Sequence, residues 1–434
     1  MRNSTPTLLI IIGITGDLSK RMLLPALNEL AKANELPNDF YLIGTTRQPN
    51  INASDFFQNV NGEILNINIA EESSYKILKK KLNSIEKKFK SKAQRIFYLS
   101  IPPQISRPVI ELLGKSGLSK IENTKILLEK PFGTDLESAK ELINEIDKYF
   151  SEESVYRIDH YLAKEMAQNL IVFRLGNSLF KHTWNRNFIE KIEILAAEKI
   201  GIEGRANFYE QTGALKDVVQ SHLLQLAALV LMDLPETFDI TDIPQKRLEA
   251  LKRLQPVIGK SVHGQYEGYR DEVNNSNSIV ETFASITLAS TASKWKGVPI
   301  ILTTGKCLNE KRTEIKITYR QEDVRESNQL TLRLQPNEGI ELSLWAKKPG
   351  YDKQIEPHKI SFSYRDHYQS FPEAYERVLL DAVNSDHSLF TLSMEVIESW
   401  RIIEPLQRKW ELDDNSLIIY KPNSKAGQVI AMAD

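Results

Sequence analysis

The chain has 434 residues, of which 41% are apolar and 26% are charged, as in ordinary globular domains. Its formal net charge of −1 excludes a protein dominated by the positive surface that nucleic acids or anionic membranes attract. The length exceeds what one hydrophobic core usually covers, so we expect two domains. The single cysteine, Cys307, excludes an intrachain disulfide and favours a reducing, cytoplasmic setting. We find no run of the roughly 18 apolar residues that a membrane span needs.

The first third of the chain alternates between strand-like and helix-like segments. Continuous apolar runs predict buried strands at residues 8–12, 40–44, 96–100 and 125–128. Helical patterns follow at residues 17–33, where Pro25 marks a kink or a restart, at residues 70–94, and after a capping box at residues 134–137. This β-α-β order predicts a doubly wound, Rossmann-like α/β domain over residues 1–158.

The pattern changes beyond residue 158. A helix is predicted at residues 164–174, a strand at 189–196 and a long apolar helix from about 213 to 232, whereas residues 271–278 look like a polar loop. Strand-like runs then follow one another at residues 282–288, 300–303, 313–319, 329–334, 339–345 and 360–362, and helices return at 373–384 and 394–410. Strands grouped with strands predict an α+β domain with a mostly antiparallel sheet over residues 159–434.

A glycine turn, GITGDL at residues 13–18, lies where the first predicted strand meets a helix. Glycines there let the backbone approach a pyrophosphate, and the helix N-terminus offers free N–H groups. An ordinary tight turn is the alternative, because the longer G-x-G-x-x-G fingerprint is incomplete. At the end of the second strand, Arg47 stands where an acidic residue would select NAD, and a guanidinium suits a 2′-phosphate. We therefore predict NADP as coenzyme, with dual use of NAD left open and a plain surface arginine as the alternative.

Two further segments carry candidate binding groups. Lys130 follows the strand at 125–128 and should point toward the ligand crevice of such a sheet, next to Pro131, which can adopt a cis peptide. In the segment RIDHYLAKE at residues 157–165, His160, Tyr161 and Lys164 suit a phosphate dianion. A solvated turn lysine and a solvated or capping cluster are the respective alternatives.

An enzyme that uses a dinucleotide to oxidise a hydroxyl would also need a base that works near neutral pH, and two histidines are candidates. His160 lies in the segment just described, and His222 lies in the long apolar helix. A lone histidine on such a helix also fits a hydrogen-bonded core residue, so the residues alone leave the choice open.

The chain resembles the glucose-6-phosphate dehydrogenase family along almost its whole length. The matching runs occur in the same order at residues 13–21, 129–133, 157–165, 168–170, 184–186, 197–205, 213–222, 297–299, 305–306, 375–377 and 379–381. So many ordered matches make coincidence implausible.

The resemblance implies that His222 is the general base and that Asp159 orients and stabilises its imidazolium. It assigns the substrate to Lys130, His160, Tyr161, Lys164, Glu198, Asp217, Lys306 and Lys311. It assigns NADP to Gly13, Thr15, Gly16, Asp17, Leu18, Arg47 and Lys130. The implied reaction is the metal-free oxidation of D-glucose 6-phosphate at C1 to 6-phospho-D-glucono-1,5-lactone, the first step of the oxidative pentose phosphate pathway. We also expect a homodimer or a dimer of dimers.

The chain departs from the family pattern in three places. Met22 stands where a basic residue is common, the stretch between residues 57 and 95 is short, and residues 278–282 carry fewer hydroxyls than usual. Two other hypotheses stay open. An oxidoreductase of unphosphorylated sugars would give the cations His160, Lys164 and Lys306 no partner. A decayed homologue that acts as a sensor or scaffold would fit Met22 and the short stretch, but not an intact His222.

Overall fold

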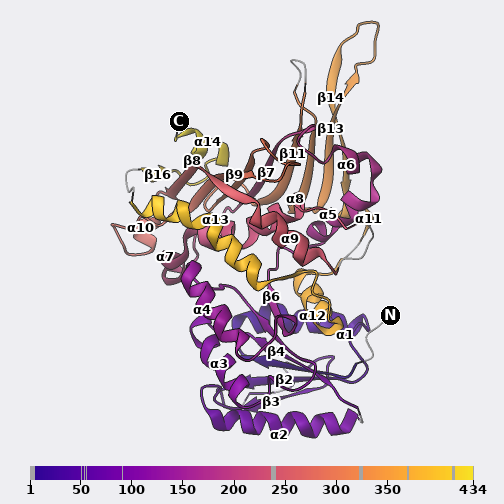
Figure 1. Cartoon of the computed structure of the whole chain (residues 1–434), viewed down its shortest axis with the longest axis vertical. Coiled ribbons are helices and arrows are strands. Elements are labelled where there is room, and N and C mark those ends of the chain that lie inside the picture. The colour runs from indigo at the N-terminus through magenta and orange to yellow at the C-terminus, as the bar shows by residue number, and fades with distance from the viewer. Residues whose placement is uncertain are drawn as a thin grey trace. The chain divides into compact units, whose positions relative to one another are not determined.

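The computed structural model describes residues 5–49, 51–52, 54, 56–89, 91–235, 241–321, 326–368, 371–412 and 416–433 (Figure 1). The chain forms two compact units. The first comprises Met1–Gly133, Glu137–Ala163 and Pro372–Ser393, and the second comprises Thr134–Leu136, Lys164–Phe371 and Met394–Asp434. The first unit therefore includes a segment from near the end of the chain, Pro372–Ser393, and the sequence pattern did not predict this.

The first unit is built on a seven-stranded sheet in the order β15-β6-β5-β4-β1-β2-β3. Its parallel strands are β1 (Thr7–Ile12), β2 (Phe40–Thr46), β3 (Gly62–Asn66), β4 (Gln94–Leu99), β5 (Thr124–Leu128) and β6 (Val155–Ile158). The short β15 (Phe390–Thr391) joins antiparallel at the edge. Every residue of β1, β4 and β5 is buried, because helices cover both faces of the sheet. The predicted doubly wound domain is confirmed.

Two hydrophobic cores lie on the two faces of this sheet. On one face pack α2 (Glu72–Phe89), α3 (Pro103–Lys115) and α4 (Leu136–Asp147). On the other pack the π-helical turn η1 (Ser19–Leu23), α1 (Leu24–Lys32) and α12 (Ala374–Asn384). Pro25 occupies the first turn of α1, where its missing N–H costs nothing, so the predicted restart is confirmed. A short 3-10 turn, η3 (Glu152–Ser154), precedes β6.

Polar side chains of the central strands hold the C-terminal end of α12. The Lys125 ammonium, on β5, donates to the Ala382 carbonyl at 2.6 Å, to Ser385 Oγ at 2.7 Å and to Gln94 Oε1 at 2.7 Å. Gln94, on β4, in turn donates to the Val383 carbonyl at 2.8 Å. These bonds satisfy carbonyls that a helix end leaves without partners. Burial lowers the pKa of Lys125 to about 8.

The second unit is built on a nine-stranded sheet in the order β14-β13-β12-β11-β7-β10-β9-β8-β16. Its strands are β7 (Ile189–Ala197), β8 (Leu254–Tyr266), β9 (Phe283–Ser290), β10 (Ile300–Gly305), β11 (Arg312–Tyr319), β12 (Gln329–Gln335), β13 (Gly339–Lys347), β14 (Ile355–Ser363) and β16 (Ile418–Tyr420). Two neighbouring pairs, β7 with β10 and β8 with β16, are parallel, and the others are antiparallel. The predicted mostly antiparallel sheet is confirmed. In Figure 1, β13 and β14 form a hairpin that extends beyond the other strands of this sheet.

The helices of the second unit are mostly short. They are α5 (Glu165–Gly176), α6 (Ser178–Thr183), α7 (Ala206–Ala214), the π-helical η4 (Leu215–Leu223), α8 (Leu224–Leu231), α9 (Ile243–Lys252), α10 (Tyr269–Glu272), α11 (Tyr364–His367), α13 (Ser393–Leu412) and α14 (Ala426–Ala431). The predicted polar loop at 271–278 is wrong at its start, because α10 covers residues 271 and 272. The predicted long helix from about 213 to 232 is confirmed as η4 followed directly by α8, and its first half is π-helical. Gly213, with φ 63° and ψ 179°, separates it from α7.

One helical stretch among the described residues, Ala206–Leu231, is long and apolar enough to cross a membrane, but 78% of its most apolar window is buried inside the protein. Its C-terminal carbonyls are satisfied by side chains. Arg174 donates to the carbonyls of Leu229 at 2.6 Å and Met232 at 2.8 Å, and Trp184 Nε1 donates to Val230 O at 2.8 Å. Burial lowers the pKa of Arg174 to about 9, which leaves its guanidinium charged at neutral pH. The stretch is therefore built as a core helix whose buried end has polar partners.

Candidate active site

The glycine turn lies at the carboxyl end of β1, as predicted. Gly13 has φ +91°, and a side chain there would place its Cβ 2.5 Å from the Ser100 carbonyl oxygen, so the position needs glycine. Gly16 N–H donates to the Gly13 carbonyl at 3.0 Å and closes the turn. Ser19, in η1, donates to the same carbonyl at 3.1 Å. The turn is thus fixed from both sides and leads directly into a helix start that can face a pyrophosphate.

A hollow of about 400 Å³ opens beside this turn at the carboxyl ends of β1, β2 and β4. Polar groups of the turn and the exposed Arg47 line one part of it, and apolar side chains line the rest, among them Ile67, Ile69, Ile101 and Ile105. Thr15 Oγ1 lies 3.2 Å from Thr46 Oγ1 at the rim. An apolar slot next to a glycine turn fits the adenine ring and the pyrophosphate of a dinucleotide. Asp17 is exposed and pairs with Arg21 at 3.5 Å, so its carboxylate is turned to solvent.

Lys130 follows β5 and is joined to Pro131 by a cis peptide bond. The preceding residue, Glu129, accepts a hydrogen bond from Tyr98 at 2.5 Å and another from Tyr375 of α12. Desolvation raises the pKa of Glu129, although both tyrosines and the Lys130 charge oppose this shift. The pKa of Tyr375 is raised by burial and by Glu129. A partly buried carboxylate with two phenol donors therefore adjoins Lys130.

Asp159 lies just beyond β6 and is buried. Its carboxylate accepts the Tyr161 N–H at 2.9 Å and its carbonyl accepts the Leu162 N–H at 3.0 Å, so the segment turns tightly around it. His160 is half-buried, and its ring meets that of Tyr161 edge-on at 5.0 Å between centroids. Asp159 also lies near enough to Glu129 and Tyr375 to influence their pKa values. The first unit thus places Asp159 and the predicted group Lys130 in one charged neighbourhood.

In the second unit, η4 carries two of the predicted residues. Asp217 lies in its first turn and His222 near its end, where His222 is 5% exposed. In an α-helix, residues five apart point about 140° away from each other, whereas i→i+5 bonding in a π-helix brings them close to one side. The π-helical geometry therefore brings Asp217 and His222 toward a common face of the segment.

Lys306 and Glu198 form a largely buried ion pair between the ends of β10 and β7. The Lys306 ammonium also lies 5.3 Å from the centroid of the Tyr209 ring. The pKa of Tyr209 is raised by burial first and then by Asp217, with Glu281 and Glu198 adding to the effect. These relations bring the predicted residues Lys306, Glu198 and Asp217 together around Tyr209, which the sequence alone did not single out.

The remaining predicted residues of the second unit are less enclosed. Lys164 precedes α5 and donates to Gln335 Oε1 at 2.7 Å. Lys311 is exposed before β11. In the first unit, Leu18 precedes η1 and packs against the core shared with α1 and α12, and Met22 is 39% exposed. Neither glutamate was predicted as a site residue: Glu281 is a lone glutamate in a loop, and Glu129 was noted only as the first residue of the matching run 129–133.

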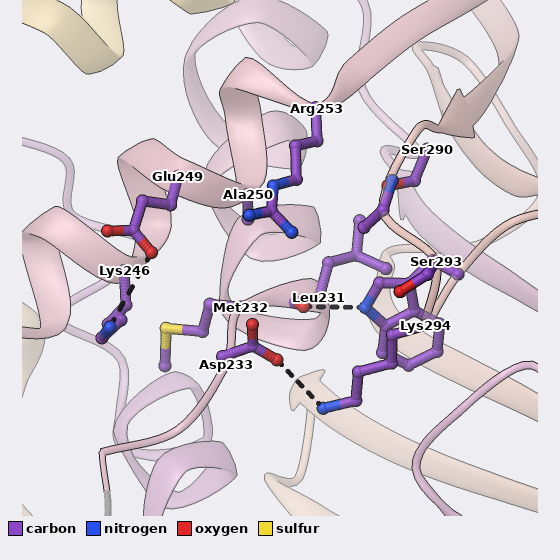
Figure 2. A pocket seen from close by; sticks show the side chains of 12 residues that line it. Leu231, Met232, Asp233, Lys246, Glu249, Ala250, Arg253, Ser290, Ser293 and Lys294 are labelled. Carbon is purple, nitrogen blue, oxygen red and sulfur yellow. Dashed lines mark hydrogen bonds and ion pairs between the residues drawn. The ribbon is translucent and has the colours of Figure 1, made fainter.

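A second hollow, of about 80 Å³, lies at the end of α8 (Figure 2). Four of its five charged lining residues pair with one another, Lys294 with Asp233 at 3.3 Å and Lys246 with Glu249 at 3.8 Å, and the fifth is Arg253. Trp295 Nε1 also donates to the Leu231 carbonyl, at 2.8 Å. None of its lining residues belongs to the predicted site, and we assign it no ligand.

The doubly wound sheet, its glycine turn and the hollow at its carboxyl edge define the class of dinucleotide-binding oxidoreductases. Comparison with known proteins gives the same class and a family within it. The model of the glucose-6-phosphate dehydrogenase NAD binding domain matches residues 10–66 and 52–169, and that of the C-terminal domain matches residues 171–432. The chain belongs to the glucose-6-phosphate dehydrogenase family and is an oxidoreductase of carbohydrate metabolism.

Individual relatives match over nearly their full length. The glucose-6-phosphate 1-dehydrogenase of Chlamydia muridarum is 35% identical over 93% of this chain and 90% of its own. That of Borreliella burgdorferi is 36% identical over 93% of this chain and 91% of its own. A solved glucose-6-phosphate dehydrogenase in complex with its substrate glucose-6-phosphate superposes with a TM-score of 0.91 at 31% identity, covering 100% of this chain and 98% of the other.

Proposed function

We propose that this chain oxidises D-glucose 6-phosphate at C1 to 6-phospho-D-glucono-1,5-lactone and passes the hydride to NADP. The observation that carries the proposal is the full-length likeness to a solved relative in complex with glucose-6-phosphate. The reaction would open the oxidative pentose phosphate pathway, and it uses no metal. Within the chain, we propose residues 1–158 as the coenzyme domain and residues 159–434 as the domain for substrate binding and self-association.

The proton chemistry is proposed for His222 and Asp159. A base must take the C1 hydroxyl proton as the hydride leaves the same carbon, and an imidazole does this near neutral pH. His222 is buried on η4, and Asp159 is buried beyond β6. Asp159 is proposed to orient the His222 ring and to stabilise the imidazolium that forms.

The remaining site residues are proposed to bind the sugar phosphate. His160, Tyr161 and Lys164 would hold the phosphate through charge-assisted hydrogen bonds. Glu198 and Asp217 would accept bonds from sugar hydroxyls, with Lys306 and Lys311 as further cations and Lys130 between the sugar and the coenzyme. The ion pair of Lys306 with Glu198 supports this role, because it presets the orientation of both side chains.

The coenzyme is proposed to bind at the glycine turn, with contacts from Gly13, Thr15, Gly16, Asp17, Leu18, Arg47 and Lys130. When bound, the nicotinamide accepts the hydride. Arg47 lines the same hollow as Thr46 and the glycine turn, which supports a contact with a 2′-phosphate. Arg47→Ser should therefore raise the KM for NADP far more than that for NAD; an equal change in both would remove Arg47 from the coenzyme preference.

The purified chain is the direct test. Glucose 6-phosphate with NADP should give NADPH, detected by its absorbance, at a far higher kcat/KM than free glucose. A preference for free glucose would overturn the proposed substrate, and no NADPH with either sugar would favour the sensor or scaffold hypothesis. His222→Asn should still bind glucose 6-phosphate but lose turnover by about 10³-fold or more. Unchanged turnover would assign the base to another residue.

We propose a homodimer or a dimer of dimers in the cytoplasm. The sheet of the second unit supports this, since strands β7 to β11 and helix α14 border a hollow of about 1080 Å³ that mixes apolar and charged side chains. Light scattering of the purified chain gives its mass directly, and a monomer at micromolar concentration would refute the proposal.

A further inference from the structure

Glu281 lies in the loop before β9, in the stretch where the sequence departs from the family pattern, and it contacts the start of η4. Its carboxylate oxygen Oε1 accepts the Leu215 N–H at 2.8 Å, and its main-chain carbonyl accepts the Ala214 N–H at 2.9 Å. A helix start leaves several N–H groups without partners and carries a partial positive charge. The N-cap residue of η4, Ala214, has a methyl side chain, which cannot accept a hydrogen bond from these N–H groups. Glu281 supplies this cap from another part of the chain.

Gly213 makes room for the contact. A Cβ on Gly213 would lie 2.5 Å from Glu281 Oε1, and the backbone of Gly213 is in a conformation that other residues rarely adopt, with φ 63° and ψ 179°. The preceding helix α7 thus ends at a residue without a side chain, and the freed space holds the carboxylate. The two hydrogen bonds to Glu281 therefore fix the position at which the first turn of η4 begins.

The position of that first turn matters because of what η4 carries. Asp217 lies two residues beyond Leu215, and His222 lies seven residues beyond it. Both residues belong to the proposed active site, so this inference rests on the proposed function. A change at the start of the helix reaches Asp217 first, since the effect of a cap falls off within a turn. Substrate binding through Asp217 should then suffer more than proton transfer by His222.

We infer that Glu281 is a positioning residue for the active site, which sets Asp217 through its cap on η4 and does so best as a carboxylate. Among the described residues, the titratable groups that face Glu281 come from four elements: Tyr209 of α7, Tyr269 of α10, Lys216 of η4 and Glu411 of α13. One of these four groups, Lys216, is a cation. It lies on η4, the helix whose Leu215 N–H donates to Glu281.

Burial raises the pKa of Glu281 to about 7, against the bond from Leu215. An acid whose pKa is raised on folding contributes stability that is fully present below its unfolded pKa of 4.5 and is lost as the pH rises from there through the folded pKa of about 7. The cap on η4, in contrast, is strongest once the carboxylate has formed. Stability and substrate binding should therefore change in opposite directions across neutral pH, which a residue with a merely structural role would not produce.

The first experiment compares Glu281→Gln with the wild type in glucose 6-phosphate oxidation from pH 6 to pH 8. The ratio of the two KM values cancels every ionisation that both proteins share. We expect it to rise from about 1 at pH 6 to about threefold to tenfold at pH 8, with kcat changed less. In the same buffers, the variant should melt at a higher temperature than the wild type at pH 8. A flat KM ratio, or a lower melting temperature at pH 8, would overturn the inference.

The second experiment needs no turnover. Hydrogen exchange of a peptide that spans residues 213–223 should be about tenfold faster in Glu281→Ala than in the wild type, because the Leu215 amide loses its acceptor. Glu272→Ala is the matched control, since Glu272 accepts the Tyr266 hydroxyl at 2.5 Å and, among the described residues, makes no hydrogen bond to η4. Equal exchange rates in Glu281→Ala and Glu272→Ala would refute the inference that Glu281 caps η4. A wild type without turnover would refute the proposed function alone, while this experiment would still decide the role of Glu281.

Discussion

The buried ammonium of Lys125 gives a stability that depends on pH in a calculable way. The folded protein lowers the pKa of Lys125 from 10.5 to about 8, because burial disfavours the charged form. Its three acceptors are the Ala382 carbonyl, Ser385 Oγ and Gln94 Oε1, none of which carries a negative charge. A pKa that is depressed on folding contributes stability that is present above the unfolded pKa and is lost as the pH falls through the folded pKa.

The magnitude follows from the two pKa values. A shift of 2.5 units corresponds to about 3 kcal/mol in all, at about 1.4 kcal/mol for each unit. Between pH 7 and pH 9.5 the wild type should gain about 2 kcal/mol of this, or about a thirtyfold smaller population of opened molecules. This gain in stability arises where Lys125 joins β5 to the end of α12. The exchange rates of backbone amides in β5 and α12 should therefore show it.

Hydrogen exchange measures this opening when the known pH dependence of the intrinsic rates is removed. We expect protection in peptides from β5 and α12 to rise by about thirtyfold from pH 7 to pH 9.5 in the wild type, and not in Lys125→Met, which cannot titrate. Lys79→Met is the control, because the Lys79 ammonium also donates to a helix-end carbonyl, that of Ser116, at 3.0 Å, but is half exposed. The reasoning is refuted if Lys125→Met keeps the pH dependence of the wild type.

Three further outcomes follow from the geometry. Gly13→Ala should abolish coenzyme binding measured by titration while glucose 6-phosphate still binds, because the added Cβ would meet the Ser100 carbonyl at 2.5 Å. Lys164→Ala should raise the KM for glucose 6-phosphate by about tenfold to a hundredfold with little effect on the weak turnover of free glucose, since only the former has a phosphate; equal effects on both sugars would contradict a phosphate contact. Trp184→Phe should lower the free energy of unfolding by about 2–4 kcal/mol in urea titrations followed by circular dichroism, because the buried Val230 carbonyl loses its donor and a gap remains. A loss below about 0.5 kcal/mol would show that water replaces the indole.

The predictions from sequence succeeded where local pattern decides structure. Continuous apolar runs such as residues 8–12 are typical of strands buried between two layers of helices, so four of the six parallel strands, β1, β2, β4 and β5, were found. The long strand β8 was missed, since Pro256 and Gly259 interrupt the alternation that marks a half-buried strand. The strand β3 was missed for another reason, because its five residues are too few and too exposed to stand out.

The candidate site likewise has residues that a local sequence pattern reveals and residues that it does not. Glycine turns and charged clusters can be recognised in one sequence, because their chemistry lies in adjacent residues. The bond from Tyr375 to Glu129 joins residues on α12 and behind β5, and no local pattern foretells it. The π-helical form of η4 is equally hidden, since its residues have the composition of an ordinary amphipathic helix and its cap, Glu281, comes from a distant loop.

The return of residues 372–393 to the first unit has a consequence for how the protein is made. The helix α12 covers one face of the parallel sheet, yet about 200 residues of the second unit are synthesised between the end of β6 and α12. At the usual pace of translation, this face of the sheet lacks α12 for about 10–40 s on the ribosome. The nascent coenzyme domain is therefore a natural client for chaperones, and a fragment that stops at residue 163 should aggregate although it contains the whole glycine turn.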